Sequence, residues 1–398
     1  MRTRLFALLL ALLPACGGGD DRKGAAPLGG LLEIGDVEMA RERRDPSWRS
    51  VVELDTTLLG DSTSVADSLA LLERWEDISA RSVNGAPMLL PLGADLARGD
   101  SLAGPSVLRV QVLLDRALFS PGVIDGRWGV NTEKAVYWFQ RREGLRTTAR
   151  VDSATFARLA ERAGTPVQLV RAHRLTPDDV RGPFLPMPED PYARAELECQ
   201  CYESRAEKLG ERFHVTPALL SQLNPGVNLH AALAGDVLSV PHVRDSLAAG
   251  AAPVARIVVS DRGRYVHAVD ARGYILFHFP STLGSRYNPS PTGALVVESV
   301  TENPWWHYQP ALLDGKNPDD PEAHLPPGPN NAVGLVWMAL SEPHYGIHGT
   351  QAPHTIGYAT SSGCVRLTNW DALFLARRIA AGTPVEFRDP HTVVAEVE

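Results

Sequence analysis

A single cysteine in a glycine-containing turn, close behind a histidine, is the feature that most restricts what this chain of 398 residues can be. The chain reads HGT at residues 348 to 350 and SGCVR at residues 362 to 366. A thiol with an ordinary pKa of about 8.5 becomes a good nucleophile near neutral pH only beside a base or a positive field. The turn after His348 can return the chain to Cys364, so we expect the imidazole within hydrogen-bond reach of the thiol. A cysteine packed as a small hydrophobe is the alternative, and it leaves the surrounding residues unexplained.

The residues around this pair extend the motif in both directions. The sequence HYGIHGTQAPHTIGYATSSGCVRLTNWDALFL at residues 344 to 375 resembles the L,D-transpeptidase (YkuD-type) catalytic domain. The resemblance covers residues 254 to 388 and includes PTG at 291 to 293 and NPWW at 303 to 306. It departs from the family at Ser362, where many members carry a second histidine.

The resemblance implies a role for each residue of the motif. Cys364 would attack a peptide carbonyl and form a thioester, and His348 would take the thiol proton as a base that titrates near neutral pH. The carbonyl of Gly349 would orient the imidazole. Backbone N–H groups of Gly363 and Cys364 are expected to hold the oxyanion. Arg366 is expected to pair with a substrate carboxylate, or else to hold the loop through an ordinary ion pair. Further substrate contacts are expected from Tyr345, Thr350, Ser362 and Trp306.

The family's reaction would make the chain a cell-wall acyltransferase. Cys364 would attack the bond between the third residue and the terminal D-Ala of a stem tetrapeptide, and an amine on a second stem would resolve the thioester as a 3-3 cross-link. Water as acceptor would give an L,D-carboxypeptidase or endopeptidase, and a lysine of an envelope protein would attach that protein to peptidoglycan. A non-catalytic peptidoglycan-binding protein is the alternative of another class. The intact Cys364, His348 and Arg366 argue against it.

Composition limits the partners that the chain can take. A formal net charge of -8 without a basic stripe argues against nucleic acid, because phosphate binding needs concentrated Lys and Arg. A cysteine nucleophile needs no cofactor, and no second Cys/His pair stands at zinc-ligand spacing, so no metal is expected. The length allows two or three folded units, at roughly 100 to 200 residues per domain.

The N-terminus predicts export. The charged start MRTR precedes an apolar run at residues 5 to 13 that is too short to span a bilayer, as in a signal peptide. LPAC at residues 13 to 16 resembles a lipoprotein cleavage box, which predicts a signal peptide of residues 1 to 16 and a lipid on Cys16; an ordinary secretory signal is the alternative. Residues 17 to 104 hold a flexible Gly/Ala/Pro tether and an unassigned region. We therefore expect a membrane-anchored protein of the bacterial cell envelope or periplasm.

A helical module is predicted at residues 105 to 162. Apolar residues recur at helical spacing on both sides of the loop IDGRWG at 124 to 129, and Thr132 and Asp152 occupy positions expected of helix N-caps. The sequence DGRWGVNTEKAVYWFQ at 125 to 140 resembles the three-helix peptidoglycan-binding domain family. A generic helical bundle is the alternative.

A second, smaller module is predicted at residues 199 to 243. It resembles a LysM repeat, with two helices and the strand GDVLSVP at 235 to 241 but no clear first strand. Such a module binds N-acetylglucosamine or, as a degenerate copy, spaces its neighbours. Prolines between residues 177 and 191 predict a semi-rigid linker at 163 to 198. Cys199 and Cys201 are expected to be structural or reduced, because one intervening residue would strain a mutual bridge.

The catalytic segment, residues 254 to 388, is predicted to be mainly β. Apolar runs at 257 to 259, 265 to 269 and 274 to 279 are separated by short turns, which predicts successive hairpins and a curved sheet or sandwich. The Pro-rich stretch from Gln309 to Asn331 is either a lid over the active-site groove or an inert surface loop. The expected fold class is multidomain: this mainly β catalytic domain, preceded by the three-helix domain and the LysM-like α+β segment.

Overall fold

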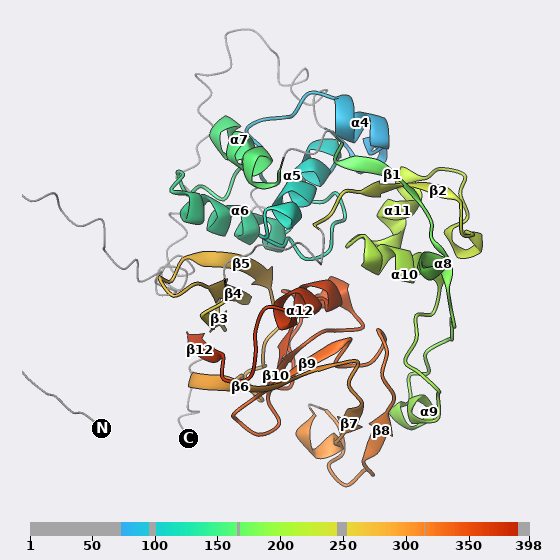
Figure 1. Cartoon of the computed structure of the whole chain (residues 1–398), viewed down its shortest axis with the longest axis vertical. Coiled ribbons are helices and arrows are strands. Elements are labelled where there is room, and N and C mark those ends of the chain that lie inside the picture. The colour runs from blue at the N-terminus through green and yellow to red at the C-terminus, as the bar shows by residue number, and fades with distance from the viewer. Residues whose placement is uncertain (1–72, 95–100, 165–167, 245–252, 314, 389–398) are drawn as a thin grey trace, which may run out of the picture. The chain divides into compact units, whose positions relative to one another are not determined.

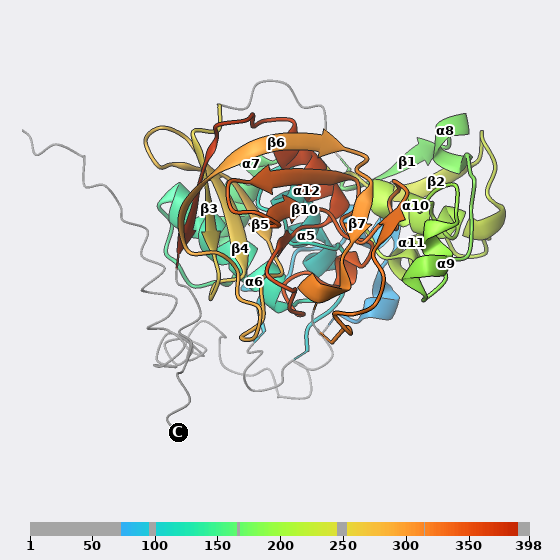
Figure 2. The same cartoon turned by 90° about the horizontal axis from the view of Figure 1, so that it is seen from below.

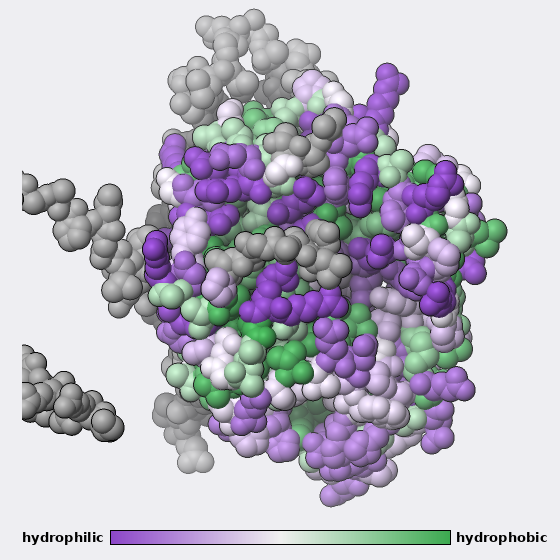
Figure 3. Space-filling model, in the orientation of Figure 1, coloured by the Kyte–Doolittle hydropathy of each residue, from purple (hydrophilic) through white to green (hydrophobic). Residues whose placement is uncertain are grey.

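The structure is a computed structural model, and it describes residues 73–94, 101–164, 168–244, 253–313 and 315–388. The predicted signal peptide, the tether and Cys16 lie outside the described residues. Within the described ranges, no helix is long and apolar enough to cross a membrane. Figure 3 shows one face of the molecule, on which polar residues are interspersed with smaller apolar areas.

Three helices form the first module (Figure 1). They are α5 (Pro105–Arg116), α6 (Val130–Glu143) and α7 (Ser153–Arg162), and they follow the short η2 (Trp75–Asp77) and α4 (Ala80–Gly85). Asp152 caps α7 as predicted, accepting a hydrogen bond from the Thr155 N–H at 2.7 Å. The prediction for Thr132 is wrong: α6 already begins at Val130, and the Thr132 hydroxyl instead accepts a hydrogen bond from Gln111 Nε2 at 3.2 Å.

The segment predicted to resemble a LysM repeat pairs its last strand with a strand from the predicted linker. Strand β1 (Val170–Arg174) pairs antiparallel with β2 (Val237–Pro241), and α10 (Arg205–Arg212), α11 (Pro217–Leu223) and η4 (Leu229–Ala231) lie between them in the chain. The order is therefore β-α-α-β. The predicted linker also holds α8 (Pro177–Val180) and α9 (Pro191–Ala195). β1 was missed because its sequence, VRAHR, has only two apolar residues and no run that signals a strand.

One apolar core joins these two modules. Leu108 and Val112 of α5 pack in the same buried cluster as Leu209 of α10 and Leu238 of β2. Burial of apolar surface is the main stabilising contribution in folding, so the three-helix module and the β-α-α-β unit stabilise each other.

The cysteine pair at the start of the predicted LysM-like module is bridged. Cys199 and Cys201 form a disulfide with their Cα atoms 5.2 Å apart. They were predicted to be structural or reduced rather than joined to each other, and the bridge contradicts that prediction. This Cα separation lies inside the range that disulfides tolerate, because the single residue between the two cysteines turns the chain enough to bring the thiols together.

The catalytic segment forms a mainly β domain around one eight-stranded sheet, seen from two directions in Figures 1 and 2. The strand order is β11-β10-β9-β6-β12-β3-β4-β5. The predicted hairpins are confirmed, because β3, β4 and β5 pair antiparallel in sequence order. The strands of the sheet are β3 (Arg256–Ser260), β4 (Tyr265–Val269), β5 (Ile275–Pro280), β6 (Gly293–Glu302), β9 (Val336–Leu340), β10 (Gly346–His348), β11 (Val365–Arg366) and β12 (Pro384–Arg388).

Helix α12 (Asn369–Ala376) covers the core of this sheet. Its Phe374 packs edge-on against Phe277 of β5, with ring centroids 5.1 Å apart. A separate pair of short strands, β7 (Trp306–Tyr308) and β8 (Ala323–Leu325), borders the sheet with η5 (Pro310–Leu312), and η6 (Pro353–Thr355) lies in the loop after β10.

A buried ion network connects the helical module with α12. Arg244 donates from Nη1 to Asp115 Oδ1 of α5 at 2.9 Å and from Nη2 to Asp371 Oδ1 of α12. Ser120 donates to the other oxygen of Asp371 at 2.9 Å, and His214 Nδ1 lies 3.0 Å from Asp115. Burial alone would raise the pKa of Asp115, but Arg244 and His214 lower it to about 2.

Candidate active site

The two halves of the motif meet as neighbouring strands. β10 and β11 run parallel, with Ile347 beside Val365 and His348 beside Arg366. Ile347 and Val365 belong to the apolar core of the sheet. Because side chains alternate between the faces of a strand, His348 and Arg366 project from the opposite face. Cys364, two residues before Arg366, projects from that face too.

The His348 imidazole is fixed by contacts on two sides. Its Nδ1 lies 2.7 Å from the carbonyl oxygen of Gly349, which only accepts, so Nδ1 carries the proton and Nε2 presents its lone pair. The ring stacks on Trp337 of β9, with centroids 5.3 Å apart and an interplanar angle of 26°. Burial, together with the positive charge of Arg366, lowers the pKa of His348 to about 3. The base was predicted to titrate near neutral pH, and its burial is the reason for the difference.

The Cys364 thiol is protonated and turned toward a backbone carbonyl. Sγ lies 3.6 Å from the carbonyl oxygen of His344, and among the hydrogen bonds of residues 315–388 none joins Sγ to His348. Burial raises the pKa of the thiol, against the opposing effects of the Gly346 N–H and the Arg366 charge. The free site therefore holds a neutral thiol and a neutral imidazole, and a proton has to move between them before the sulfur can attack.

The turn before Cys364 depends on Gly363 and on Ser361. Gly363 has a φ of 108°, and a Cβ on it would lie 2.6 Å from a ring carbon of Tyr345. The Gly363 N–H donates to Ser361 Oγ at 3.2 Å, and this hydroxyl in turn donates to the carbonyl of Cys364 at 2.6 Å. The Gly363 N–H was expected to hold an oxyanion, but it already has a partner. Ser361 was not singled out, because its role depends on the shape of the turn.

The loop that follows His348 is held by Asn369 at the start of α12. Asn369 Oδ1 accepts hydrogen bonds from the N–H groups of Thr350 at 3.1 Å and Leu335 at 3.0 Å. A Cβ on Gly349 would lie 2.1 Å from this oxygen, so only glycine fits there. The Thr350 hydroxyl accepts from the Ala352 N–H, and Thr350 does not line the cavity described next, although a substrate contact was expected from it.

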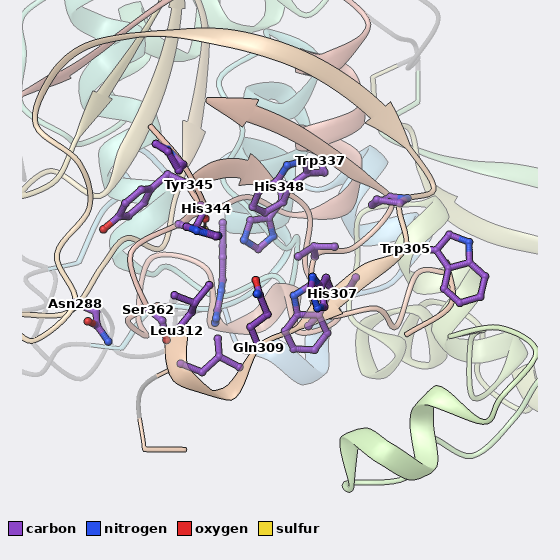
Figure 4. Close-up of a pocket in the computed structure, with 18 of the residues that line it drawn as sticks. Asn288, Trp305, His307, Gln309, Leu312, Trp337, His344, Tyr345, His348 and Ser362 are labelled. Atoms are coloured by element: carbon purple, nitrogen blue, oxygen red, sulfur yellow. Dashed lines mark hydrogen bonds between the residues drawn. The ribbon is translucent and has the colours of Figure 1, made fainter. Parts of the chain in front are cut away.

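A cavity of about 570 Å³ opens over His348 and Cys364. Four other residues predicted from the sequence line it, namely Arg366, Tyr345, Ser362 and Trp306. Figure 4 shows Trp337 and His348 close together, with His307, Gln309 and Leu312 on the facing wall. The Pro-rich stretch that begins at Gln309 therefore forms part of the cavity wall and is not an inert surface loop.

Arg366 lines this cavity, and one of its donors is unused. Its Nε is buried and has no hydrogen-bond partner among the described residues. A buried donor without a partner costs about 1–3 kcal/mol, and a bound carboxylate or carbonyl would remove that cost. No group of three or more His, Cys, Asp or Glu among the described residues is placed to hold a metal ion.

Several residues of the site were missed from the sequence. Trp337, Asn288 and His307 line the cavity but belong to no motif, and His344, which begins the motif sequence at 344 to 375, was given no role. Trp337 lies opposite His348 in the antiparallel pair of β9 and β10. That pairing could have been proposed from the apolar run at 336 to 340, but its register could not.

Two family models match the chain. The model described as "L,D-transpeptidase catalytic domain" matches residues 255–387, and the model described as "Putative peptidoglycan binding domain" matches residues 103–159. These matches agree with the mainly β fold and the three-helix module described above.

Individual proteins and structures are similar as well. The protein named "Putative L,D-transpeptidase YkuD" of Bacillus licheniformis is 31% identical over 179 residues, which are 45% of this chain and 90% of that protein. The protein of the same name from Bacillus subtilis is 28% identical over 174 residues, 44% of this chain and 87% of that protein. The structure of the L,D-transpeptidase (residues 123–326) from Xylanimonas cellulosilytica aligns with 15% identity and a TM-score of 0.32, over 76% of this chain and 98% of that one. The length and identity of the match to the Bacillus licheniformis protein show that the chain belongs to the L,D-transpeptidase family and is an enzyme of that class.

Proposed function

We propose that this L,D-transpeptidase acts on stem tetrapeptides of peptidoglycan with Cys364 as the nucleophile and His348 as the general base. The observation that carries the proposal is the state of His348. The imidazole is neutral, its Nδ1 proton is bound by the Gly349 carbonyl, and its Nε2 lone pair is available in the cavity that Cys364 also lines.

In the first half-reaction the Sγ proton passes to His348 Nε2 while sulfur attacks the carbonyl carbon of the third residue, which is bonded to the nitrogen of the terminal D-Ala. The C–N bond breaks, the nitrogen of D-Ala takes the proton back from the imidazolium, and D-Ala leaves. The third residue remains bound to Cys364 as a thioester. Of the two N–H groups expected to hold the oxyanion, that of Gly363 already donates to Ser361, so we propose the Cys364 N–H as donor.

In the second half-reaction an amine attacks the thioester and His348 accepts its proton. With the amine of a second stem the product is a 3-3 cross-link, and the thiol is restored. Water in this step would give an L,D-carboxypeptidase or endopeptidase, and a lysine of an envelope protein would give a protein linked to peptidoglycan. Arg366, with its unpartnered buried Nε, would bind a substrate carboxylate.

The test is mass analysis of products after mixing the protein with purified disaccharide-tetrapeptide, beside a Cys364→Ala variant. Cysteine-dependent dimer supports transpeptidation to a second stem. Tripeptide and free D-Ala without dimer would favour water as acceptor. Equal turnover by the variant would contradict the role of Cys364.

The location and the modules complete the proposal. We propose an exported envelope protein that is held to a membrane by a lipid on Cys16, with the three-helix domain at 105 to 162 binding peptidoglycan. The LysM-like unit at 199 to 243, with β1 added, would bind glycan or support its neighbours. A Cys16→Ser variant that still fractionates with membranes would contradict the lipid anchor.

A further inference from the structure

A segment of the β-α-α-β unit reaches the wall of the active-site cavity. It comprises residues 181 to 203, between β1 and α10, and we call it the arm. Its α9 packs against β8 (Figure 1). The Tyr192 ring of α9 meets Tyr308 of β7 edge-on at 6.0 Å, and its hydroxyl donates to the Pro321 carbonyl at 2.9 Å. Tyr308 itself stacks edge-on with Trp306, which lines the cavity.

Arg194 joins the arm to two loops of the catalytic domain. Its Nε donates to Gln200 Oε1 at 2.8 Å within the arm. Its Nη2 donates to the carbonyl of Asn330 and, at 2.7 Å, to Oε1 of Gln351. Asn330 lies just before the cavity residues Ala332 and Val333, and Gln351 directly follows the HGT motif. A planar guanidinium with several fixed donors suits this role better than a single ammonium.

The disulfide presents Gln200 to the same wall. The Gln200 N–H donates to the Pro327 carbonyl, and its own carbonyl accepts from the Asn330 N–H, each at 2.9 Å. Asn330 Nδ2 also donates to the Cys201 carbonyl at 2.8 Å. Gly328 makes this approach possible, because a Cβ there would lie 2.2 Å from the Gln200 carbonyl oxygen. Gln200 is completely buried.

The wall loop continues from these contacts to the loop of His348. The Asn331 side chain bonds within the loop, to the Pro326 carbonyl and the Val333 N–H. A Cβ on Gly334 would lie 2.6 Å from the carbonyl carbon of Gly349. Residues 326 to 334 therefore connect the arm, the cavity lining and the peptide that orients His348.

We propose that Arg194 and the disulfide-closed loop of residues 199 to 201 are positioning residues of the transpeptidase site, and that they hold the wall at residues 326 to 334 only while Cys199 and Cys201 are bridged. The proposal rests on the proposed role of Cys364 as nucleophile. Closing the loop limits the conformations of Gln200, so the bond favours the geometry that binds Pro327 and Asn330.

Opening the bond is a two-electron thiol–disulfide exchange. A dithiol reductant attacks one sulfur, forms a mixed disulfide and then closes its own disulfide, which leaves two thiols on the arm. Both cysteines are partly exposed and thus accessible to the reductant. Cys364 is already a free thiol, so the same reductant does not change the nucleophile.

The experiment compares four forms of the whole protein: oxidised wild type, wild type reduced with dithiothreitol, the Cys199→Ser/Cys201→Ser double variant, and Arg194→Ala. The exposed Arg171→Ala on β1 is the matched control. We expect kcat/KM for the tetrapeptide donor to fall about 10- to 100-fold in the last three, mainly through KM, because a displaced wall misplaces the donor. Hydrogen exchange of the peptide covering residues 328 to 334 should rise in the same three forms.

Alkylation of Cys364 by iodoacetamide separates positioning from general damage. The reagent is small and does not use the wall, so its rate at Cys364 should be equal in all forms, whereas a misfolded site would change it. Unchanged exchange at residues 328 to 334, or equal donor kinetics in oxidised and reduced protein, would overturn the proposal. If oxidised wild type fails to turn over the tetrapeptide, the role of Cys364 is contradicted. Hydrogen exchange of residues 328 to 334 then tests by itself whether the disulfide holds the wall.

Discussion

Glu211 and Asn369 join the β-α-α-β unit to the loop that orients His348. Asn369 Nδ2 lies 3.1 Å from both carboxyl oxygens of Glu211, while its Oδ1 holds the N–H of Thr350. Glu211 belongs to α10 and Asn369 begins α12. The amide side chain of Asn369 thus connects a helix of the β-α-α-β unit to the HGT motif. The carboxyl group that it binds, that of Glu211, can gain or lose a proton.

Stability should depend on the protonation of Glu211. Burial raises the pKa of Glu211 to about 7, above the value in an unfolded chain. Between these two pKa values the carboxyl group is protonated in the folded state and ionises on unfolding. Its favourable contribution to the free energy of unfolding is therefore full below about pH 4.5 and is lost as the pH rises to 7. We expect the free energy of unfolding to drop by about 3 kcal/mol over this range from Glu211 alone. Denaturant melts between pH 4.5 and 8 measure it.

A Glu211→Gln variant should remove this part of the pH dependence of the free energy of unfolding, because the amide oxygen still accepts from Asn369 and does not ionise. Two neighbours remain in the variant, namely Tyr202, which donates to Glu211, and the nearby Glu207. They contribute to the slope of the free energy of unfolding against pH that is left. The exposed Glu298→Gln on β6 is the matched control and should keep the wild-type slope. Parallel slopes for wild type and Glu211→Gln would contradict the prediction.

The acid limb of the pH profile should report the burial of His348. With a pKa of about 3, the imidazole stays neutral down to that pH and remains able to accept the thiol proton. We expect kcat/KM for acylation of Cys364 to stay flat from pH 7 to pH 5 and to fall only below pH 4. With a carbapenem as the acylating reagent, the reaction can be followed by the mass of the Cys364 peptide.

His348→Gln should lower the acylation rate about 10²- to 10⁴-fold, because the general base is lost while the bulk of the side chain remains. An acid limb at the ordinary histidine pKa of about 6.5 would show that the imidazole is exposed to solvent during the reaction. That result would contradict the buried, neutral base.

The candidate residues for the chemistry could be picked out from the sequence, because the proposed reaction demands a thiol and a base in a short, glycine-rich context. Cys364, His348 and Arg366 were all found in this way, and the structure brings them together on neighbouring strands. The hairpins β3 to β5 were found because their apolar runs are separated by short turns.

Residues whose role depends on tertiary contact could not be found. Asn369 matters because α12 brings it beside the HGT loop, and Trp337 because of strand register. Arg194 is one of many arginines in the sequence, and only the structure shows the three acceptors around its guanidinium. The bridge between Cys199 and Cys201 was missed because spacing alone does not reveal how the chain turns at Gln200.

Loss of Arg244 should destabilise the protein strongly. Arg244→Leu would leave the carboxylates of Asp115 and Asp371 buried without their cation. Removing one partner of a buried ion pair costs about 3–5 kcal/mol, and denaturant melts at pH 7 should show a loss of this size. The exposed Arg272→Ala should melt like wild type. A loss below about 1 kcal/mol, the size expected of a surface pair, would show that the network is open to solvent.

Arg366 should distinguish substrates by their terminal carboxylate. Its buried Nε has no partner in the free site, and a planar guanidinium binds a carboxylate through two N–H groups, which the ammonium of lysine cannot do. We expect Arg366→Lys to lower kcat/KM for the tetrapeptide at least tenfold, a loss of about 1.4 kcal/mol in transition-state binding. With a donor whose terminal D-Ala carboxylate is replaced by an amide, wild type should lose activity by a similar factor, and Arg366→Lys should lose little more. Equal losses from the amide in both enzymes would mean that Arg366 does not contact that carboxylate and serves to hold the loop.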